Sequence, residues 1–157
     1  MFVPLQHIHP MLVHFPIVLF YLAAAFDIGA TLTGRSVTDR STAGRISLAL
    51  VVLAALSAIA TYIFGSMALN VAEAGGFHSD VAEMHEKLGG LTAMAFVIWA
   101  ALRTITWWSN ARLPGALRAA VPLVGILGAI LITATAYYGG ELVYGLGVNV
   151  AHAASGG

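Results

Sequence analysis

Four long apolar stretches constrain this chain more than any other feature of its sequence. They cover about residues 10–32, 46–69, 84–108 and 119–142. Each is long enough to cross about 30 Å of hydrocarbon as a helix, which takes roughly 20 apolar residues. Only 9% of the 157 residues are charged, against about 25% in a soluble domain, so the surplus apolar surface must face lipid. The sequence therefore predicts an all-α integral membrane protein in which residues 1–157 form one antiparallel, up-and-down four-helix bundle.

Basic residues gather at one end of this predicted bundle. The first and third connections and their borders hold Arg35, Arg40, Arg45, Arg103, Arg112 and Arg118. The other side has one cation, Lys87. Because cytoplasmic connections of membrane proteins carry an excess of lysine and arginine, we expect the arginine side to be cytoplasmic. The second connection and both termini then lie on the outer side, an N-out/C-out topology.

All six histidines fall on the predicted outer side: His7, His9, His14, His78, His85 and His152. His14 lies about one turn inside the first span. Asp80 is a predicted N-cap with Glu83 at the capping-box position, which places His85 about one turn inside the third helix. The first and third helices of an up-and-down bundle are diagonal neighbours, so side chains at equal depth face each other across the core. We therefore expect His14 to face His85.

Two facing imidazoles in an apolar bundle suit a b-type haem, which needs a histidine on each side of the porphyrin. The chain has no cysteine, which excludes iron–sulfur clusters, zinc-thiolate sites and covalent haem attachment. His9 is about 140° from His14 around an ideal helix, so the two cannot bind one iron from a regular helix. We predict haem b on His14 and His85, with His9 as an interfacial residue or a ligand of a second site.

Two alternatives to haem remain open at this stage. The outer side offers haem propionates only Lys87, whereas it holds the acidic residues Glu73, Asp80, Glu83, Glu86 and Glu141. Imidazole with carboxylate suits a divalent cation, so His14, His85 and His9 are also candidate ligands of zinc, copper or iron without porphyrin. The second alternative is a structural or anchoring subunit without a cofactor, in which the histidines are ordinary polar residues of the interface.

The end of the fourth span contains a glycine pair with a predicted role. Gly139 and Gly140 favour either a helix stop or a close approach of two backbones. Glu141 follows at the predicted depth of His14 and His85. A carboxylate there is a candidate acceptor for an imidazole N–H, which would orient a ligand. We therefore include Gly139, Gly140 and Glu141 in the candidate cofactor site.

Three motifs resemble a known family. They are His9-Pro10-Met11-Leu12-Val13-His14-Phe15-Pro16-Ile17, His85 followed by Leu88-Gly89, and Gly139-Gly140-Glu141-Leu142-Val143-Tyr144 followed by Gly147-Val148. Together, and over nearly the whole chain, they resemble the bacterial family of small four-helix membrane proteins called domain of unknown function 2231. The resemblance implies a helical, multi-pass membrane protein of bacteria. Together with the arginine pattern, it leads us to expect a place in the bacterial inner membrane with periplasmic termini. It also implies a further histidine where this chain has Leu146, which favours one haem over two.

The sequence contains no nucleophile–base set, phosphate-binding loop or H-E-x-x-H motif. Its net charge is zero, which gives no indication of nucleic-acid binding. We therefore expect an electron carrier or subunit in the lipid bilayer rather than a self-contained enzyme. Its predicted partners are quinol or a periplasmic c-type cytochrome, whose basic surface would complement the acidic outer side. A homo-oligomer or a larger membrane redox complex is also expected.

Overall fold

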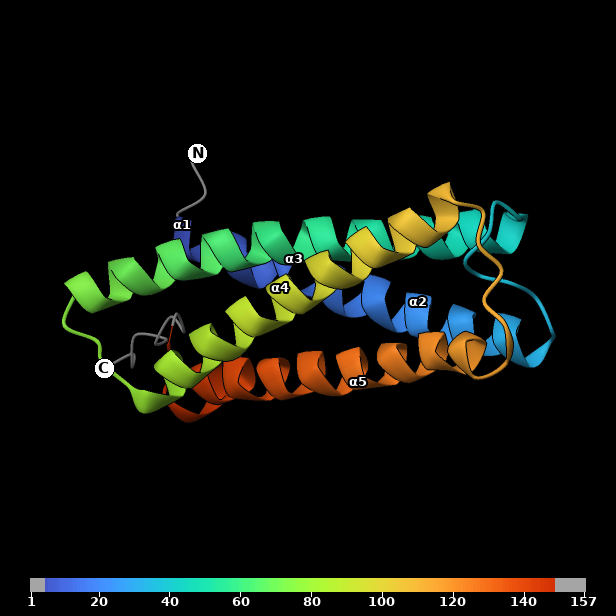
Figure 1. Cartoon of the computed structure of the whole chain (residues 1–157). Coiled ribbons are helices and arrows are strands. Elements are labelled where there is room, and N and C mark those ends of the chain that lie inside the picture. Colours follow the sequence, from blue (N-terminus) through green and yellow to red (C-terminus); the bar gives the residue numbers. More distant parts are fainter. Residues whose placement is uncertain (1–4, 149–157) are drawn as a thin grey trace.

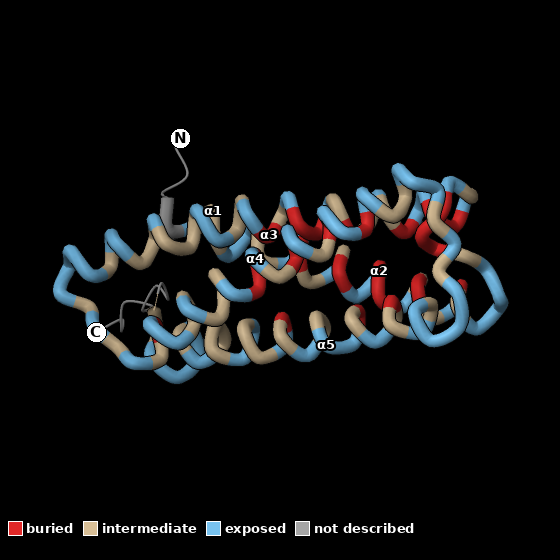
Figure 2. The backbone as a smooth tube through the Cα atoms, in the orientation of Figure 1, coloured by how far each residue is buried: buried red, intermediate tan, exposed pale blue. Residues whose placement is uncertain are grey.

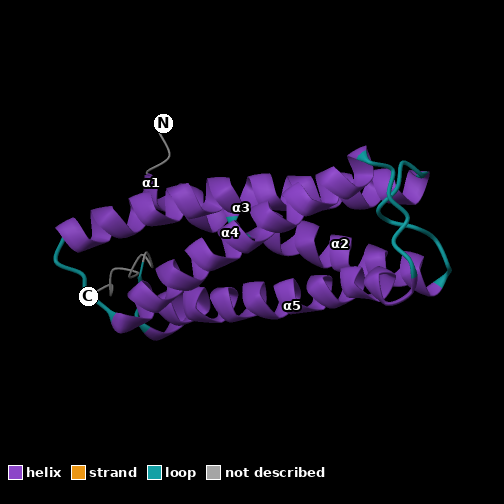
Figure 3. Cartoon of the chain, in the orientation of Figure 1, coloured by secondary structure: helices purple, strands orange, loops and turns teal. Residues whose placement is uncertain are grey.

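The structure, a computed structural model, describes residues 5–148, and its regular elements are all helices (Figures 1 and 3). No strand occurs in this described range. The elements in chain order are α1 (Leu5–Leu12), α2 (His14–Leu32), α3 (Thr42–Ala74), α4 (Asp80–Trp108), α5 (Gly115–Gly140) and the π-helical turn η1 (Glu141–Gly145). The prediction of an all-α fold is confirmed.

These helices form four candidate membrane spans, as predicted. The spans are His7–Leu32, Thr42–Ala74, Asp80–Trp108 and Gly115–Gly145. The first includes both α1 and α2. Each helix begins about four or five residues before the predicted apolar boundary, because polar residues continue the helix beyond the apolar stretch. This early start changes the depth at which the histidines lie.

The four spans pack in an antiparallel ring (Figure 1). Helices α2 and α4 each pack against α3 and α5, and no backbone contact joins α2 to α4 within the described residues. The first and third spans are therefore diagonal, as predicted. We call the end with α1, the 75–79 connection and η1 the histidine end. The opposite end, with the 33–41 and 109–114 connections, is the arginine end.

Local hydrogen bonds begin and end these helices. The Ser41 hydroxyl accepts from the backbone N–H of Gly44 and caps α3 at 3.2 Å. Ser79, rather than the predicted Asp80, caps α4 by accepting from the N–H of Val81. Helices α2, α3 and α4 each end with a left-handed residue two positions on, at Gly34, Gly76 and Asn110. A backbone bond spanning five residues closes each of these ends, as in a Schellman motif.

Fully buried side chains concentrate in the middle of the bundle and at the arginine end (Figure 2). The central core includes Phe20 and Phe96, whose rings stack with centroids 3.8 Å apart and planes 11° apart. Beyond Pro16, Ala58, Thr92 and Ile132 toward the histidine end, Ala82 alone is buried among the described residues. The bundle is therefore tightly packed over most of its length and looser around the histidines.

A buried ion pair lies between the central core and the arginine end. Arg103, 2% exposed, donates from Nη1 to Asp27 Oδ2 at 2.6 Å and from Nη2 to the carbonyl of Val37 at 2.6 Å. Ser47 donates to the other oxygen of Asp27. Arg103 lies inside α4, within the predicted third span, and satisfies the carboxylate across the bundle axis.

Candidate cofactor site

His9 and His85 face each other across the histidine end. Their ring centroids are 6.0 Å apart, and their planes are inclined at 77°. The prediction that His14 faces His85 is wrong, because His14 is exposed. Helix α1 begins at Leu5, four residues before His9, just as α4 begins five residues before His85. His9 therefore matches the depth of His85, and His14 lies farther along the span on another face.

A backbone carbonyl of the neighbouring helix holds each ring. His9 Nδ1 lies 3.0 Å from the carbonyl oxygen of Thr61 on α3, and His85 Nδ1 lies 3.0 Å from that of Thr135 on α5. A carbonyl oxygen can only accept, so Nδ1 donates in both rings. In a neutral imidazole the lone pair is then on Nε2, which is the nitrogen free to bind a metal. This is the usual way in which a ligating histidine is oriented.

A glycine one helical turn after each threonine makes room for the ring. A Cβ atom on Gly65 would lie 2.8 Å from His9 Cε1, and one on Gly139 would lie 2.9 Å from His85 Cε1. Both distances are shorter than normal carbon–carbon contacts, so any larger residue would displace the imidazole. The close approach at Gly139 is therefore to the His85 side chain, not to a second backbone as predicted. The same Thr-x-x-x-Gly arrangement serves both histidines.

Thr61 also bonds to a backbone carbonyl near the start of the first span that has no helical partner. Pro16 has no N–H, so the carbonyl of Leu12 lacks its helical partner. The hydroxyl of Thr61 donates to this oxygen at 3.3 Å. Thr61 therefore contacts α1 twice, through its hydroxyl at Leu12 and through its carbonyl at His9. These two bonds fix α1, and with it His9, against α3.

The two halves of the protein repeat this pattern. Three pairs meet across the bundle axis, and the members of each pair are 76 residues apart in the chain: His9 with His85, Phe20 with Phe96, and Asp27 with Arg103. The histidine-to-threonine separations are also similar, at 52 and 50 residues. The first two spans are thus related to the last two by an approximate two-fold arrangement. The paired histidines lie on its axis.

The remaining predicted site residues lie elsewhere. Helix α5 ends at Gly140, where the glycine pair predicts a helix stop, and the chain continues directly into the π-helical turn η1. A Cβ atom on Gly140 would have nothing within 4 Å. Glu141 is exposed, and its Oε2 lies near Gly145. The expectation that Glu141 accepts from a ligand imidazole is not met at His85, where the carbonyl of Thr135 has this role.

The other histidine positions expected on the outer side are exposed where the structure describes them. Leu146, where the resemblance implies histidine, is exposed beside η1. His7 and His78 are also exposed, and His152 lies outside the described residues.

The pair brings two imidazole rings together. Within residues 5–148, no group of three or more histidine, cysteine or acidic side chains is arranged to hold a metal ion. A non-haem metal site usually takes three or four protein ligands. A haem brings four nitrogen ligands of its own, so two histidines complete its iron. Two imidazoles therefore match the number of axial ligands that a haem iron takes from a protein.

Comparison with known proteins identifies a family. A family described as "Predicted membrane protein (DUF2231)" matches residues 6–152. No curated protein and no solved structure matches the chain. The match covers all four spans and both halves of the histidine pair, and its description names no ligand, substrate or partner.

Proposed function

Since the chain belongs to the DUF2231 family of membrane proteins, whose description names no chemistry, we propose a function from its own geometry. The protein binds one b-type haem between His9 and His85. It transfers electrons at the histidine end of the bundle. The observation that carries this proposal is the pair of carbonyl-held imidazoles on diagonal helices, with ring centroids 6.0 Å apart.

The separation of the rings agrees with two ligands on opposite sides of one metal ion. Metal–imidazole bonds are about 2.0–2.1 Å long, which puts the centroids of two opposed rings about 6 Å apart. Both rings present Nε2 as the free nitrogen, since Nδ1 is bonded to a threonine carbonyl. These hydrogen bonds also raise the basicity of Nε2 and fix the ring orientation. The ligands are therefore already held in position by the protein.

The loose packing of the histidine end supports a large apolar ligand. The described residues around the pair are half-buried rather than fully buried, in contrast to the core below. Helix α1 has no backbone contact with α4 or α5 in the described chain, although its histidine faces α4. A flat porphyrin between the two hairpins would supply the packing that this end lacks. Bound haem would provide one-electron chemistry there.

The charge distribution supports one orientation of the bundle in the membrane. From the positive-inside rule we infer that the arginine end faces the cytoplasm and that the histidine pair lies near the periplasmic face of the bacterial inner membrane. Glu73, Asp80 and Glu83 are exposed at that end. Their charge suits a basic c-type cytochrome, and the proximity to lipid suits quinol. The protein acts with such a partner as a single chain, a homo-oligomer or a subunit of a larger redox complex.

The cofactor is tested by purifying the protein from haem-replete cells and recording oxidised and dithionite-reduced spectra. We expect a Soret band, a sharp α band on reduction, and a pyridine haemochrome of the b type at one haem per chain. A colourless protein that also fails to take up added haemin would contradict the proposal. Stoichiometric zinc, copper or iron without porphyrin would contradict it in favour of a non-haem site.

The orientation is tested with single cysteines, since the natural chain has none. Glu73→Cys lies at the histidine end and Ser109→Cys at the arginine end, and both positions are exposed. A membrane-impermeant thiol reagent added to spheroplasts should label Glu73→Cys at once. It should label Ser109→Cys only after the membrane is permeabilised. The reverse pattern would place the histidine pair on the cytoplasmic side.

A further inference from the structure

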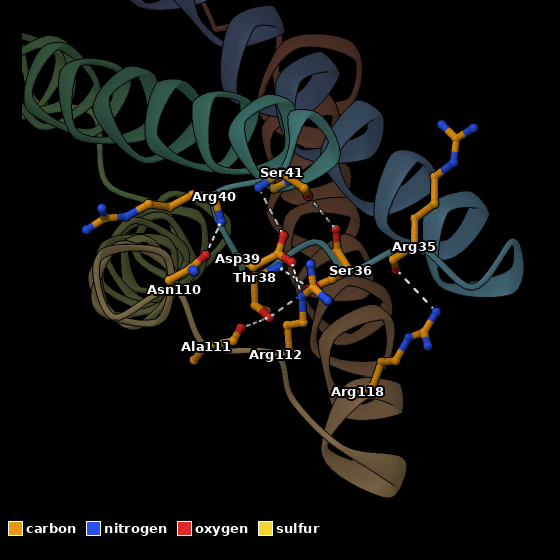
Figure 4. Close-up of polar contacts among 11 residues, drawn as sticks. Arg35, Ser36, Thr38, Asp39, Arg40, Ser41, Asn110, Ala111, Arg112 and Arg118 are labelled. Carbon is orange, nitrogen blue, oxygen red and sulfur yellow. Dashed lines mark hydrogen bonds and ion pairs between the residues drawn. The ribbon is translucent and has the colours of Figure 1, made fainter.

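The arginine end contains a polar cavity of about 600 Å³, far from the histidine pair. It lies between the 33–41 connection, the start of α3, and the segment from Arg112 to the first turn of α5. Figure 4 shows Arg112 and Arg118 beside the 33–41 connection, with the Arg35 side chain extending away from both. Its charged and hydroxyl-bearing lining residues are Arg35, Ser36, Asp39, Ser41, Thr42, Arg112 and Arg118. The cavity thus combines three guanidinium groups with three hydroxyl groups.

The charge of this cavity is positive. Its single acidic lining residue, Asp39, is already paired with Arg112, whose Nε lies 2.8 Å from Asp39 Oδ2. The Asp39 side chain is only 3% exposed, whereas that of Arg112 is 82% exposed. The N-terminus of α3, at Thr42, adds the positive end of a helix dipole. An anion entering the cavity would therefore meet an excess of cationic groups.

Arg118 is held in place by hydrogen bonds from one of its nitrogens, and its guanidinium has further N–H groups that can donate. Its Nη2 donates to the carbonyls of Thr31 and Arg35 at 3.2 and 3.3 Å. Its Nε is buried and has no hydrogen-bond partner among the described residues. The Thr31 hydroxyl, on the residue that accepts from Arg118, is also buried and unpartnered there. Arg118 Nε and Thr31 Oγ1 thus have no partner within the described protein, as is also the case for Arg103 Nε and Trp107 Nε1 elsewhere in the bundle.

An apolar cavity of about 340 Å³ adjoins the polar one along α2. It is lined by Phe26, Gly29, Ala30, Thr33 and Arg35, so the two cavities share Arg35. Helix α2 is part of a candidate membrane span, so this apolar cavity lies on a segment that is long and apolar enough to cross a bilayer. A molecule with an anionic head and an apolar tail matches both.

We propose that these two cavities bind one anionic phospholipid. Arg35, Arg112 and Arg118 bind its phosphate, and one acyl chain lies against Phe26, Gly29 and Ala30. A free inorganic phosphate would use only the polar cavity and would leave the adjoining apolar one empty. Basic sites between membrane helices at the cytoplasmic surface bind anionic headgroups in this way. The proposal does not depend on haem, because the two sites lie at opposite ends of the bundle.

The test uses the full protein in detergent, with melting temperature and native mass spectrometry as readouts. The probes are phosphatidylglycerol, phosphatidylcholine with the same acyl chains, and inorganic phosphate. We expect phosphatidylglycerol to raise the melting temperature and remain bound, while the other two do neither. Arg35→Gln should weaken this binding about fivefold, as expected for one basic group at an anionic surface. Arg118→Gln should weaken it at least as much.

Two features keep the test decisive. Arg35 contributes its carbonyl, not its side chain, to the contact with Arg118, so Arg35→Gln leaves that bond in place. Arg45→Gln is the matched control, because Arg45 is exposed at the same end and does not line either cavity. Equal effects of the two lipids, or equal loss in Arg45→Gln and Arg35→Gln, would overturn the proposal. A full effect of phosphate alone would overturn the assignment to a lipid.

Discussion

The imidazoles of His9 and His85 meet at a centroid distance of 6.0 Å, although they come from helices without backbone contact in the described chain. Each ring forms a hydrogen bond with the next helix of its own hairpin. His9 bonds to the carbonyl of Thr61, and His85 bonds to the carbonyl of Thr135. The relationship therefore joins the two halves of the protein. Any change that moves one ring against its own hairpin alters the separation of the pair.

Gly139→Ala should lower the haem content of the purified protein. The new methyl group would lie 2.9 Å from His85 Cε1, so the ring must shift away from its position opposite His9. Gly140→Ala is the neighbouring control, because a Cβ there meets nothing within 4 Å. We expect Gly140→Ala to keep a full haem content. The measurement is the haem-to-protein ratio by pyridine haemochrome, and equal ratios in both variants would contradict the role given to Gly139.

Thr61→Val should weaken haem binding while conserving side-chain volume. The change removes the hydroxyl that donates to the carbonyl of Leu12, which Pro16 leaves without a helical partner. Losing this bond costs about 1–3 kcal/mol when the acceptor stays buried, and it loosens α1 against α3. Thr104→Val is the control, since its hydroxyl bonds only within its own helix, to Ala100. Haemin titration of the apoprotein should show weaker binding for Thr61→Val alone.

Asp27→Asn should destabilise the bundle strongly without changing the spectrum of bound haem. It leaves the Arg103 guanidinium buried without its carboxylate, and uncompensated buried charges cost about 3–5 kcal/mol. The double variant Asp27→Leu with Arg103→Met should recover much of this loss, because it removes both charges. The free energy of unfolding in mild detergent is the quantity to compare.

The exposed pair of Lys87 with Glu83 provides the control for this prediction. Their side chains are 71% and 64% exposed, at a distance of 3.3 Å. Glu83→Gln should therefore change the free energy of unfolding by no more than about 0.5 kcal/mol. A loss in Asp27→Asn as small as that in Glu83→Gln would show that the buried pair contributes little.

Acid should weaken the arginine end through Asp39. Burial raises the pKa of this carboxyl, but hydrogen bonds from Ser41 and the charge of Arg112 outweigh burial and hold the pKa below its ordinary value. A lowered folded-state pKa means that the contribution to stability is complete above the ordinary value, near pH 4. It is then lost as the pH falls through the lowered folded-state value. The melting temperature of the natural protein should therefore fall more steeply below pH 4 than that of Asp39→Asn.

The spans and the diagonal placement of the first and third helices follow from the sequence, because both depend on apolar length and short connections. The identity of the residue that faces His85 does not follow from the sequence. The apolar pattern puts the start of the first span at Pro10, whereas the helix begins at Leu5, and that shift exchanges His14 for His9 at the depth of His85. The sequence does indicate correctly that His9 and His14 cannot share one face.

Thr61, Gly65 and Thr135 are not predicted from the sequence because their role depends on contacts between helices. A signal for them nevertheless exists. The pattern H-x-x-L occurs at His9 and again at His85, with a phenylalanine eleven residues after each histidine. Aligning the two halves of the chain on this pattern pairs His9 with His85. It also aligns the two Thr-x-x-x-Gly segments to within two residues.

The optical spectra of His9→Ala, His85→Ala and His14→Ala test the central claim most directly. All three are measured beside the natural protein, at equal protein concentration and after reconstitution with haemin. We predict that His9→Ala and His85→Ala each lose the low-spin spectrum of two histidine ligands, because each lacks one axial nitrogen. His14→Ala should keep it, since His14 is exposed. Loss of the spectrum in His14→Ala with retention in His9→Ala would contradict this assignment.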